Sequence, residues 1–268
     1  MVLKRKRIFV STLSLRDKED LKKCMDEEIG IEIFAERPCW RDPESDFEQT
    51  KEWLRHYKGP RSLHAPFYDL NLASENHPAI REISLDTYKD FLQIAVELQC
   101  DHVTIHPNAS STQIFDTTLA RQRIKQALSL LAGKAHRLGI PLAIENIGHG
   151  DGEIFGQEAY IALLQEQVAA QALLDVGHAH INGWDIPSVI RRLGTKLAGL
   201  HLHDNDGHSD LHLPIGKGTI EWEPIWQALA ESTASPALIL EYNNAVPVEV
   251  ILEAVYRLRK LPFFDGES

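Results

Sequence analysis

The feature that most constrains the fold is an alternation of short apolar runs with longer amphipathic segments along the whole chain. The short runs are rich in β-branched and aliphatic residues, and the longer segments carry apolar residues three, four and seven positions apart. This alternation is typical of parallel strands joined by helices. We therefore predict eight strands, at 8–12, 30–34, 62–64, 102–106, 141–145, 172–175, 197–201 and 237–241.

Helical patterns follow each of these strands. The clearest covers 117–138, and Gly139 directly after it is a common way for a helix to end. The others cover 18–28, 46–57, 84–98, 157–165, 186–193, 223–230 and 248–259. Eight such units predict an α/β fold, a single (β/α)8 TIM barrel over residues 1–268. An open doubly wound sheet is the alternative, but residues 11–15 lack the glycines of a dinucleotide-binding turn.

Length and composition limit the classes of function. A chain of 268 residues suits one barrel, which takes about 250 residues. The net charge of -11 disfavours a broad polyanion-binding surface. We find neither an apolar run of the roughly 18 residues that span a membrane nor a signal peptide. We therefore expect a cytoplasmic protein with no membrane partner. Because Cys24, Cys39 and Cys100 are odd in number and lie far apart, we expect them to be reduced and structural.

Imidazole and carboxylate side chains recur where the predicted strands end. Six of them close strands three to eight, and three follow strands six and seven. The carboxyl ends of barrel strands converge on one mouth, so we expect these side chains to lie together. Mixed imidazole and carboxylate ligands suit zinc, manganese or iron, which predicts a multinuclear site for divalent metal ions. The predicted ligands are His64, His106, Glu145, Asp175, His178, His201, Asp210, His212 and Glu241.

Two short segments are expected to present ligands in pairs. Gly177 would let the backbone bend sharply, so that Asp175 and His178 offer two ligands across one turn. An extended backbone at 210–212 would place Asp210 and His212 on one side. Any single histidine of the set fits a hydrogen-bonded core position equally well, whereas the nine residues together favour a metal centre.

Several of these residues stand in motifs that resemble one superfamily. The motifs are Leu63-His-Ala-Pro-Phe67, Leu70-Asn-Leu-Ala-Ser74, Thr104-Ile-His-Pro-Asn108, Ile144-Glu-Asn146, Asp175-Val-Gly-His-Ala-His180, His201-Leu-His-Asp204, Asp210-Leu-His212, Gly216-Lys-Gly218 and Glu241. Together they resemble the xylose isomerase-like barrels, which include endonuclease IV and sugar phosphate isomerases and epimerases. The likeness runs from the third predicted strand to the eighth, and it is more specific for the superfamily than for a reaction.

The resemblance implies two alternative metal centres. The endonuclease-like pattern assigns a first metal to His64, His106 and Glu145, a second to Glu145, Asp175, His201 and Glu241, and a third to His178, Asp210 and His212. The epimerase-like pattern uses the middle group around one metal, with His178 touching the substrate. All nine positions are filled in this chain.

The leading functional hypothesis is a metal-dependent isomerase or epimerase acting on a small sugar or sugar phosphate. Glu145 and Glu241 on a shared metal would act as acid and base. The alternative is an endonuclease IV-like phosphodiesterase that cuts DNA at apurinic sites with a trinuclear metal centre. The acidic loop at 203–210, and Phe67 where endonuclease relatives place a tyrosine, favour the first. A sugar-binding barrel without catalysis is a third class.

Four further residues are predicted to contact the substrate. Arg37 and Trp40 lie in the loop after the second strand, which fits a lid over a small substrate, a DNA wedge or simple packing. Lys217 stands between two glycines and would either bind a phosphate or lie in a turn. His180 is near the expected mouth, as are His149, His203 and His208.

Overall fold

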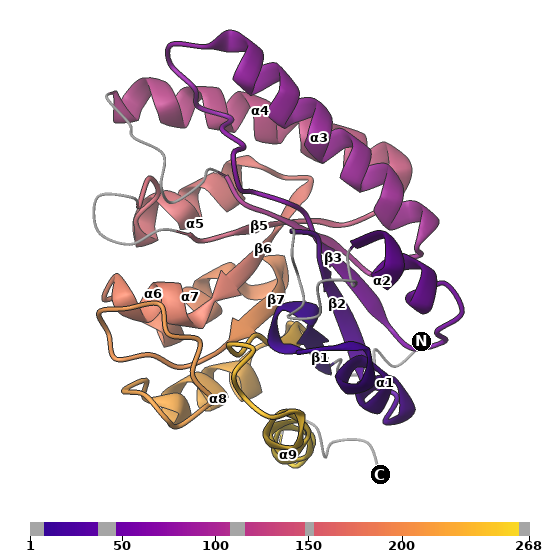
Figure 1. The fold of residues 1–268 in the computed structure, drawn as a ribbon. Coiled ribbons are helices and arrows are strands. Elements are labelled where there is room, and N and C mark those ends of the chain that lie inside the picture. The colour runs from indigo at the N-terminus through magenta and orange to yellow at the C-terminus, as the bar shows by residue number, and fades with distance from the viewer. Residues whose placement is uncertain (1–7, 37–46, 108–115, 148–152, 263–268) are drawn as a thin grey trace.

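Eight parallel strands pair in sequence order and close into a barrel, with the helices around its outside (Figure 1). The structure is a computed structural model that describes residues 8–36, 47–107, 116–147 and 153–262. The strands are β1 (Ile8–Ser11), β2 (Gly30–Phe34), β3 (Arg61–His64), β4 (Val103–Ile105), β5 (Leu142–Glu145), β6 (Ala170–Asp175), β7 (Leu197–Leu202) and β8 (Ala237–Leu240). The predicted (β/α)8 fold is therefore confirmed.

The connecting helices follow the predicted order. They are α1 (Lys18–Asp26), α2 (Phe47–Leu54), α3 (Pro78–Glu97), α4 (Thr117–Leu138), α5 (Gln157–Glu166), α6 (Val176–Ile181), α7 (Ile186–Leu193), α8 (Trp222–Glu231) and α9 (Val248–Arg259). Helix α4 ends at Gly139, whose φ of 72° is the left-handed conformation expected of a terminal glycine. Helix α6 was not predicted, and α3 begins at Pro78 rather than at residue 84.

The early start of α3 has a physical reason. Its buried face begins only at Ser84 and continues through Tyr88, Leu92 and Ala95. In the first turns, Ile80 and Ile83 are exposed, so the stripe of core-facing residues does not extend there. Pro78 is nevertheless well placed, since a first-turn proline lacks only an N–H that would have no partner within the helix.

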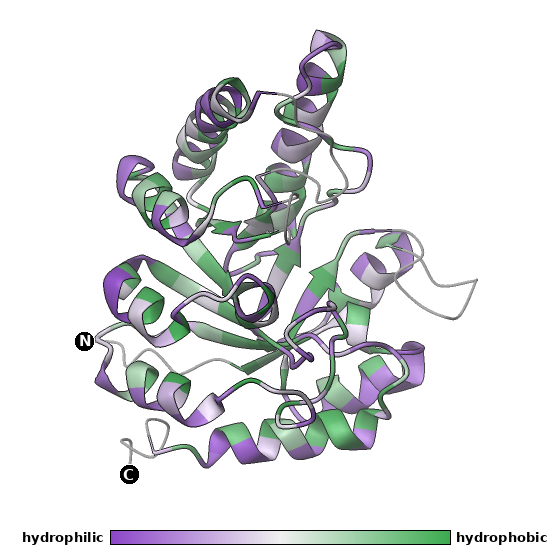
Figure 2. Cartoon of the chain, turned by 90° about the vertical axis from the view of Figure 1, so that its left-hand side faces the viewer, coloured by the Kyte–Doolittle hydropathy of each residue, from purple (hydrophilic) through white to green (hydrophobic). Residues whose placement is uncertain are grey.

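The helices turn one apolar face toward the strands. In Figure 2 the strands at the centre are largely hydrophobic, while the helices alternate between hydrophobic and hydrophilic faces. In α4 the buried residues Ala120, Ile124, Leu128 and Leu131 recur at four-, four- and three-residue intervals and form one stripe along the helix. The main apolar core therefore lies between the helices and the barrel wall.

A second, smaller apolar cluster fills the barrel interior. It consists of Phe9, Ala143, Leu173, Ala237 and Ile239, with Ala198 packed against it. Side chains alternate between the two faces of a strand, so a residue two positions later also points inward. From Ala143, Leu173 and Ile239 this rule leads to Glu145, Asp175 and Glu241. Backbone register and strand alternation thus gather these carboxylates above the interior apolar cluster.

The cysteines and the lengths of the helices bear on two expectations from the sequence. Cys24 and Cys100 are buried free thiols, and burial raises the pKa of each to about 12, as expected of structural cysteines. Cys39 lies outside the described residues. Within the described ranges, the helices are all too short or too polar to cross a membrane.

Candidate metal centre

A cavity of about 370 Å³ opens where the carboxyl ends of the strands converge. Seven of the nine predicted ligands line it, while Asp175 and His201 do not reach its surface and are fully buried. Phe34, Phe67 and Ile147 supply apolar walls. The residues that line the cavity, in the part of the chain that the structure describes, include no lysine or arginine.

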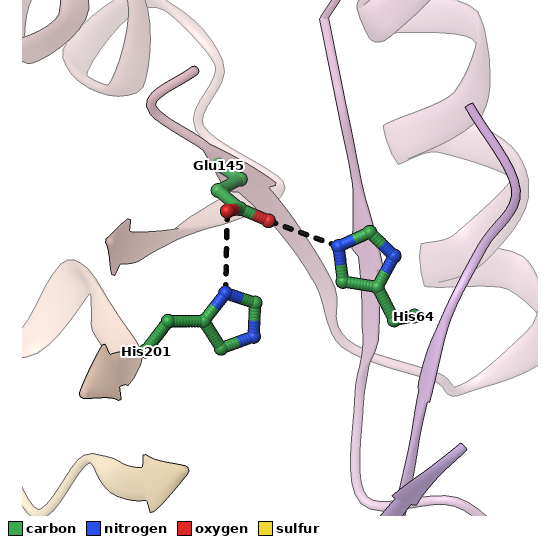
Figure 3. A group of neighbouring side chains, drawn as sticks. All are labelled: His64, Glu145 and His201. Atoms are coloured by element: carbon green, nitrogen blue, oxygen red, sulfur yellow. Dashed lines mark hydrogen bonds and ion pairs between the residues drawn. The ribbon is translucent and has the colours of Figure 1, made fainter. Parts of the chain in front are cut away.

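Glu145 at the end of β5 is the centre of this cluster. Its Oε2 lies 3.1 Å from His64 Nε2 and 3.2 Å from His106 Nε2. Its Oε1 lies 3.2 Å from His201 Nδ1, so the carboxylate stands between imidazoles from β3 and β7 (Figure 3). Phe67 stacks on His106 with ring centroids 4.0 Å apart and holds that imidazole against the wall.

The four residues Glu145, Asp175, His201 and Glu241 form an inner group. Within it, His201 lies close to all three carboxylates. Its Nδ1 lies 3.4 Å from Glu241 Oε2 and 3.7 Å from Asp175 Oδ2, in addition to Glu145. The backbone explains this meeting, because β6 and β7 pair with Asp175 opposite His201. The four residues predicted to hold one shared metal therefore do come together in the fold.

The three outer residues form a second group at the rim. Oδ2 of Asp210 lies 3.3 Å from His178 Nε2 and 3.2 Å from His212 Nε2. Asp210 and His212 do face one another, but the expected extended backbone is wrong at His212, whose φ is 48°. A non-glycine residue is strained in this left-handed conformation, and the turn it makes aims its Nε2 at Asp210.

Three of these histidines share one hydrogen-bonding arrangement. Nδ1 of His64, His178 and His212 lies 3.0, 3.0 and 2.6 Å from the backbone carbonyl oxygens of Ala65, Asn146 and Glu241. A carbonyl oxygen only accepts, so each Nδ1 carries the hydrogen, and Nε2 faces Glu145 in His64 and Asp210 in His178 and His212. Ring nitrogens of metal-binding histidines are fixed in this way by a partner on the far side of the ring.

The carboxylates of the cluster have opposite pKa shifts. Burial raises the pKa of Glu145, but the neighbouring His201 and His106 outweigh it and bring the pKa well below its ordinary value. Burial also raises the pKa of Glu241, and here His201 and His212 do not fully compensate, so that pKa stays raised. Burial lowers the pKa of His106 to about 4, which leaves its imidazole neutral at pH 7.

The donor set fits a divalent metal ion. The ligand atoms of His64, Glu145 and His201 lie within 4.8 Å of one another, as do those of Glu145, Asp175 and His178. Donors at such spacing reach a common ion through bonds of about 2.0–2.2 Å after small movements. Buried carboxylates and imidazoles in this number need compensating charge, which a cation supplies.

Gly177 has a different role from the one expected. It lies inside helix α6, which Asp175 caps by accepting the backbone N–H of His178 at 2.6 Å. A side chain at this position would overlap the ring of His203. His203 is fully buried, lies 3.1 Å from Asp175 Oδ2 through its Nε2, and stacks on His212. Gly177 is therefore needed for close packing and not for a sharp bend.

We expect Gly177→Ala to displace His203 and to lower the free energy of unfolding by about 1–3 kcal/mol, as overpacking in a core does. The matched control is Gly133→Ala within α4, where the nearest atom to an added Cβ is 3.5 Å away. That control should gain up to about 1 kcal/mol from the better helix propensity of alanine. Urea unfolding of both variants measures the difference, and equal stabilities would refute the packing role.

The loop between β7 and α8 is organised around one buried carboxylate that sequence reasoning did not single out. Asp204 is fully buried and accepts four N–H groups at 2.9–3.1 Å, from the backbones of Asn205, Gly216 and Ile220 and from the Trp222 indole. A side chain at Gly218 would overlap Asp204 and the Asn205 carbonyl. This loop carries Asp210 and His212, so Asp204 organises the segment that presents two residues of the outer group.

The four predicted substrate contacts lie in different surroundings. Lys217 is exposed on a turn whose backbone N–H bonds to Pro214, and the N–H of Gly216 is used by Asp204. His180 lies 2.8 Å from the Thr219 hydroxyl. Neither Lys217 nor His180 lines the cavity, and their contact with substrate remains a prediction. Arg37 and Trp40 lie outside the described residues.

Two residues of the cluster were missed or undervalued. Glu32 in the middle of β2 is fully buried, with Oε1 2.9 Å from His201 Nε2. The available signal was a single charge in the apolar segment Gly30-Ile-Glu-Ile-Phe34. His203 was considered only as a substrate contact, although it stands two residues after His201 and so on the same side of the chain.

Curated relatives match most of the chain. An uncharacterized protein of Methanocaldococcus jannaschii is 27% identical over 202 residues, which cover 75% of this chain and 78% of that protein. The fructoselysine 3-epimerase of Shigella flexneri is 24% identical over 247 residues, which cover 87% of this chain and 88% of the enzyme.

Solved structures share the fold. A D-tagatose 3-epimerase-like protein superposes with a TM-score of 0.80 at 22% identity, covering 95% of this chain and 96% of that one. A Thermus thermophilus protein from crystals soaked with zinc chloride has a TM-score of 0.70 at 23% identity, with 98% of each chain covered. The family model described as xylose isomerase-like TIM barrel matches residues 27–261. The chain therefore belongs to the xylose isomerase-like TIM barrel family.

Proposed function

We propose that this protein is a divalent-metal-dependent epimerase or isomerase of a small sugar. The observation that carries the proposal is the pair Glu145 and Glu241, whose carboxylate oxygens lie 3.2 and 3.4 Å from the same nitrogen of His201. Both carboxylates also line the 370 Å³ cavity. Two carboxylates that border one metal position and one substrate cavity suit proton removal and return at a carbon next to a carbonyl.

The reaction assigns a part to each group of residues. The metal, held by Glu145, Asp175, His201 and Glu241, would polarise the carbonyl and hydroxyl oxygens of the substrate. One of Glu145 and Glu241 removes a proton from the carbon beside the carbonyl. The other glutamate, in its protonated form, donates a proton to the opposite face and so inverts that carbon. His178, which lines the cavity, is placed to hydrogen-bond a substrate oxygen.

The cavity supports a small, uncharged substrate. Its volume lies at the small end of the range for ligand sites, which is about 300–1,000 Å³. Phe34 and Phe67 offer apolar surface to sugar C–H groups, and Asn243 and Asn244 offer amides to hydroxyl groups. Since the described lining contains no lysine or arginine, a phosphate group would lack the side chains that usually bind it. Similarity to the fructoselysine 3-epimerase of Shigella flexneri supports a sugar substrate.

The test is proton exchange at carbon. Mn²⁺-loaded protein is incubated in D₂O with a panel of ketopentoses and ketohexoses, and deuterium at carbon is followed by mass spectrometry together with the appearance of epimers. We expect one sugar of the panel to gain deuterium, with loss of the exchange in EDTA and in Glu241→Gln. Metal-loaded protein that exchanges no proton across the panel would refute the proposal.

A phosphodiesterase is the second candidate function. It is favoured by the outer group, in which His178 and His212 both direct Nε2 at Asp210 as two ligands of a further metal would. Glu145 also lies between His201 and the pair His64 and His106, as a bridging carboxylate of a multinuclear centre would.

The two candidates separate in a DNA assay. A duplex with one abasic site is incubated with Zn²⁺-loaded protein over a range of salt concentrations. Incision that disappears with chelator and in His106→Ala would support the phosphodiesterase. Intact DNA throughout, with deuterium exchange in the sugar panel, is the result that we expect.

A further inference from the structure

Glu32 is a buried carboxylate with no expected function in the reaction. It lies at the middle of β2, two residues after Gly30, and a side chain at Gly30 would clash with Phe9 of the interior cluster. Strand alternation therefore points Glu32 into the barrel. Its exposed fraction is 0%, and it does not line the substrate cavity. A carboxylate buried in this way costs several kcal/mol unless its partners compensate.

The main partner of Glu32 is His201. Oε1 of Glu32 lies 2.9 Å from Nε2 of His201. Its other oxygen accepts the Ser62 hydroxyl at 3.3 Å and lies 4.0 Å from His102 Nε2. Of these partners, the ring nitrogen of His201 lies nearest to the Glu32 carboxylate.

His201 is oriented in the opposite sense to the other inward histidines. His64, His178 and His212 use Nδ1 on a backbone carbonyl, and each turns Nε2 toward a single carboxylate, which is Glu145 for His64 and Asp210 for the other two. In His201, Nδ1 faces Glu145, Glu241 and Asp175, and Nε2 faces Glu32. A carboxylate thus takes the place that a carbonyl oxygen has in the other three.

A neutral imidazole carries one hydrogen and one lone pair, on different nitrogens. When Nε2–H donates to Glu32, the lone pair is on Nδ1 and points at the three metal-binding carboxylates. A carboxylate acceptor also makes the imidazole more basic than a carbonyl does, which strengthens the metal bond. We propose that Glu32 is a positioning residue that fixes His201 as an Nδ1 ligand of the metal.

A direct ligand role for Glu32 is the competing arrangement. Glu32, His201 and Glu241 offer donor atoms within 4.8 Å of one another. However, Glu32 faces the nitrogen of His201 that is turned away from Glu145. An ion beside Glu32 would need Nε2 and would leave Nδ1 and Glu145 unused. The inference rests on the metal site of the proposed function. Metal binding by variants of Glu32 distinguishes a positioning role from a direct ligand role.

The test measures Co²⁺ affinity and the visible absorption of bound Co²⁺, together with thermal unfolding of the metal-free protein. We expect Glu32→Ala to weaken Co²⁺ binding about 10- to 100-fold, as loss of such outer partners does. Glu32→Gln keeps an acceptor for Nε2–H without the charge, and its weakening should be smaller, with the wild-type spectrum retained. The matched control is Ser62→Ala, which touches Glu32 but not His201 and should change Co²⁺ affinity less than Glu32→Gln.

The outcomes are distinct. In a His201→Gln background, Glu32→Gln should have no further effect on affinity, because it acts through His201. Equal Co²⁺ affinities of wild type and Glu32→Ala, with only thermal stability changed, would overturn the inference and leave the metal site standing. A Co²⁺ spectrum altered as strongly by Glu32→Gln as by Glu145→Gln would make Glu32 a ligand and also overturn it. Wild type that binds no Co²⁺ would overturn the metal site itself, and the role of Glu32 with it.

Discussion

Glu145→Gln should abolish tight binding of a divalent metal and reduce epimerisation by at least about 10³-fold. Glu145 contacts three imidazoles at once. Nitrogens of His64, His106 and His201 lie 3.1–3.2 Å from its carboxylate. An amide keeps the shape but removes the negative charge, and its NH₂ group cannot bind a metal. Isothermal titration with Mn²⁺ and the deuterium-exchange assay measure the two losses separately.

Asp210→Asn is the matched control for this variant. Asp210 is a carboxylate at the same cavity, but it contacts the outer histidines His178 and His212. With a single metal in the inner group, Asp210→Asn should keep tight Mn²⁺ binding and most of the proton exchange. Tight Mn²⁺ binding that survives Glu145→Gln would contradict the position of the metal.

Asp204→Ala should lower the free energy of unfolding by about 4 kcal/mol. It would leave four N–H groups without an acceptor, and Asp204 itself is fully buried. Each buried N–H left without a partner costs about 1–3 kcal/mol, reduced where water enters after local relaxation. Urea unfolding followed by circular dichroism and by tryptophan fluorescence measures the loss, since Trp222 is one of the donors.

The same loop offers a control. Asp206→Ala removes an exposed carboxylate that accepts the backbone N–H groups of His208 and Ser209 at 2.8 and 2.7 Å. We expect a much smaller loss of stability, because water replaces these bonds at the surface. Similar unfolding midpoints for Asp204→Ala and Asp206→Ala would mean that Asp204 does not organise the loop.

Much of the site was predictable because the ligands stand where strands end. Glu145, Asp175 and His201 lie at or next to the last residue of a strand, and His106 and Glu241 follow directly after one. A barrel brings these ends to one mouth whatever the loops between them. The fold and the inner group therefore follow from local pattern together with one rule of architecture.

The residues that support the ligands were harder to predict. Glu32 stands within a strand and not at its end, and only the pairing of β2 with the rest of the barrel reveals which side it faces. The role of Gly177 depends on His203, which is 26 positions further along the chain but packs against it. Such contacts between distant segments leave no periodic signal in the sequence.

The loop geometry was likewise out of reach of the pattern. His212 has a left-handed backbone in a loop whose two ends, at Asn205 and at Ile220, both donate N–H groups to Asp204, while its own ring bonds to the Glu241 carbonyl. The motif Asp210-Leu-His212 by itself reads equally well as an extended segment. Asp210 and His212 face one another as expected, but the backbone conformation that brings them together depends on contacts with the rest of the barrel.

The number of metal ions bound per chain is the most direct test of a single catalytic metal in the inner group. Chelator-stripped protein is dialysed against Mn²⁺ or Zn²⁺, freed of loosely bound ions, and measured by inductively coupled plasma mass spectrometry against protein concentration. We expect one tightly held ion per chain, at Glu145, Asp175, His201 and Glu241. Three tightly held ions would indicate that the outer group is part of a multinuclear centre, and none would remove the metal site; either result would contradict the proposal.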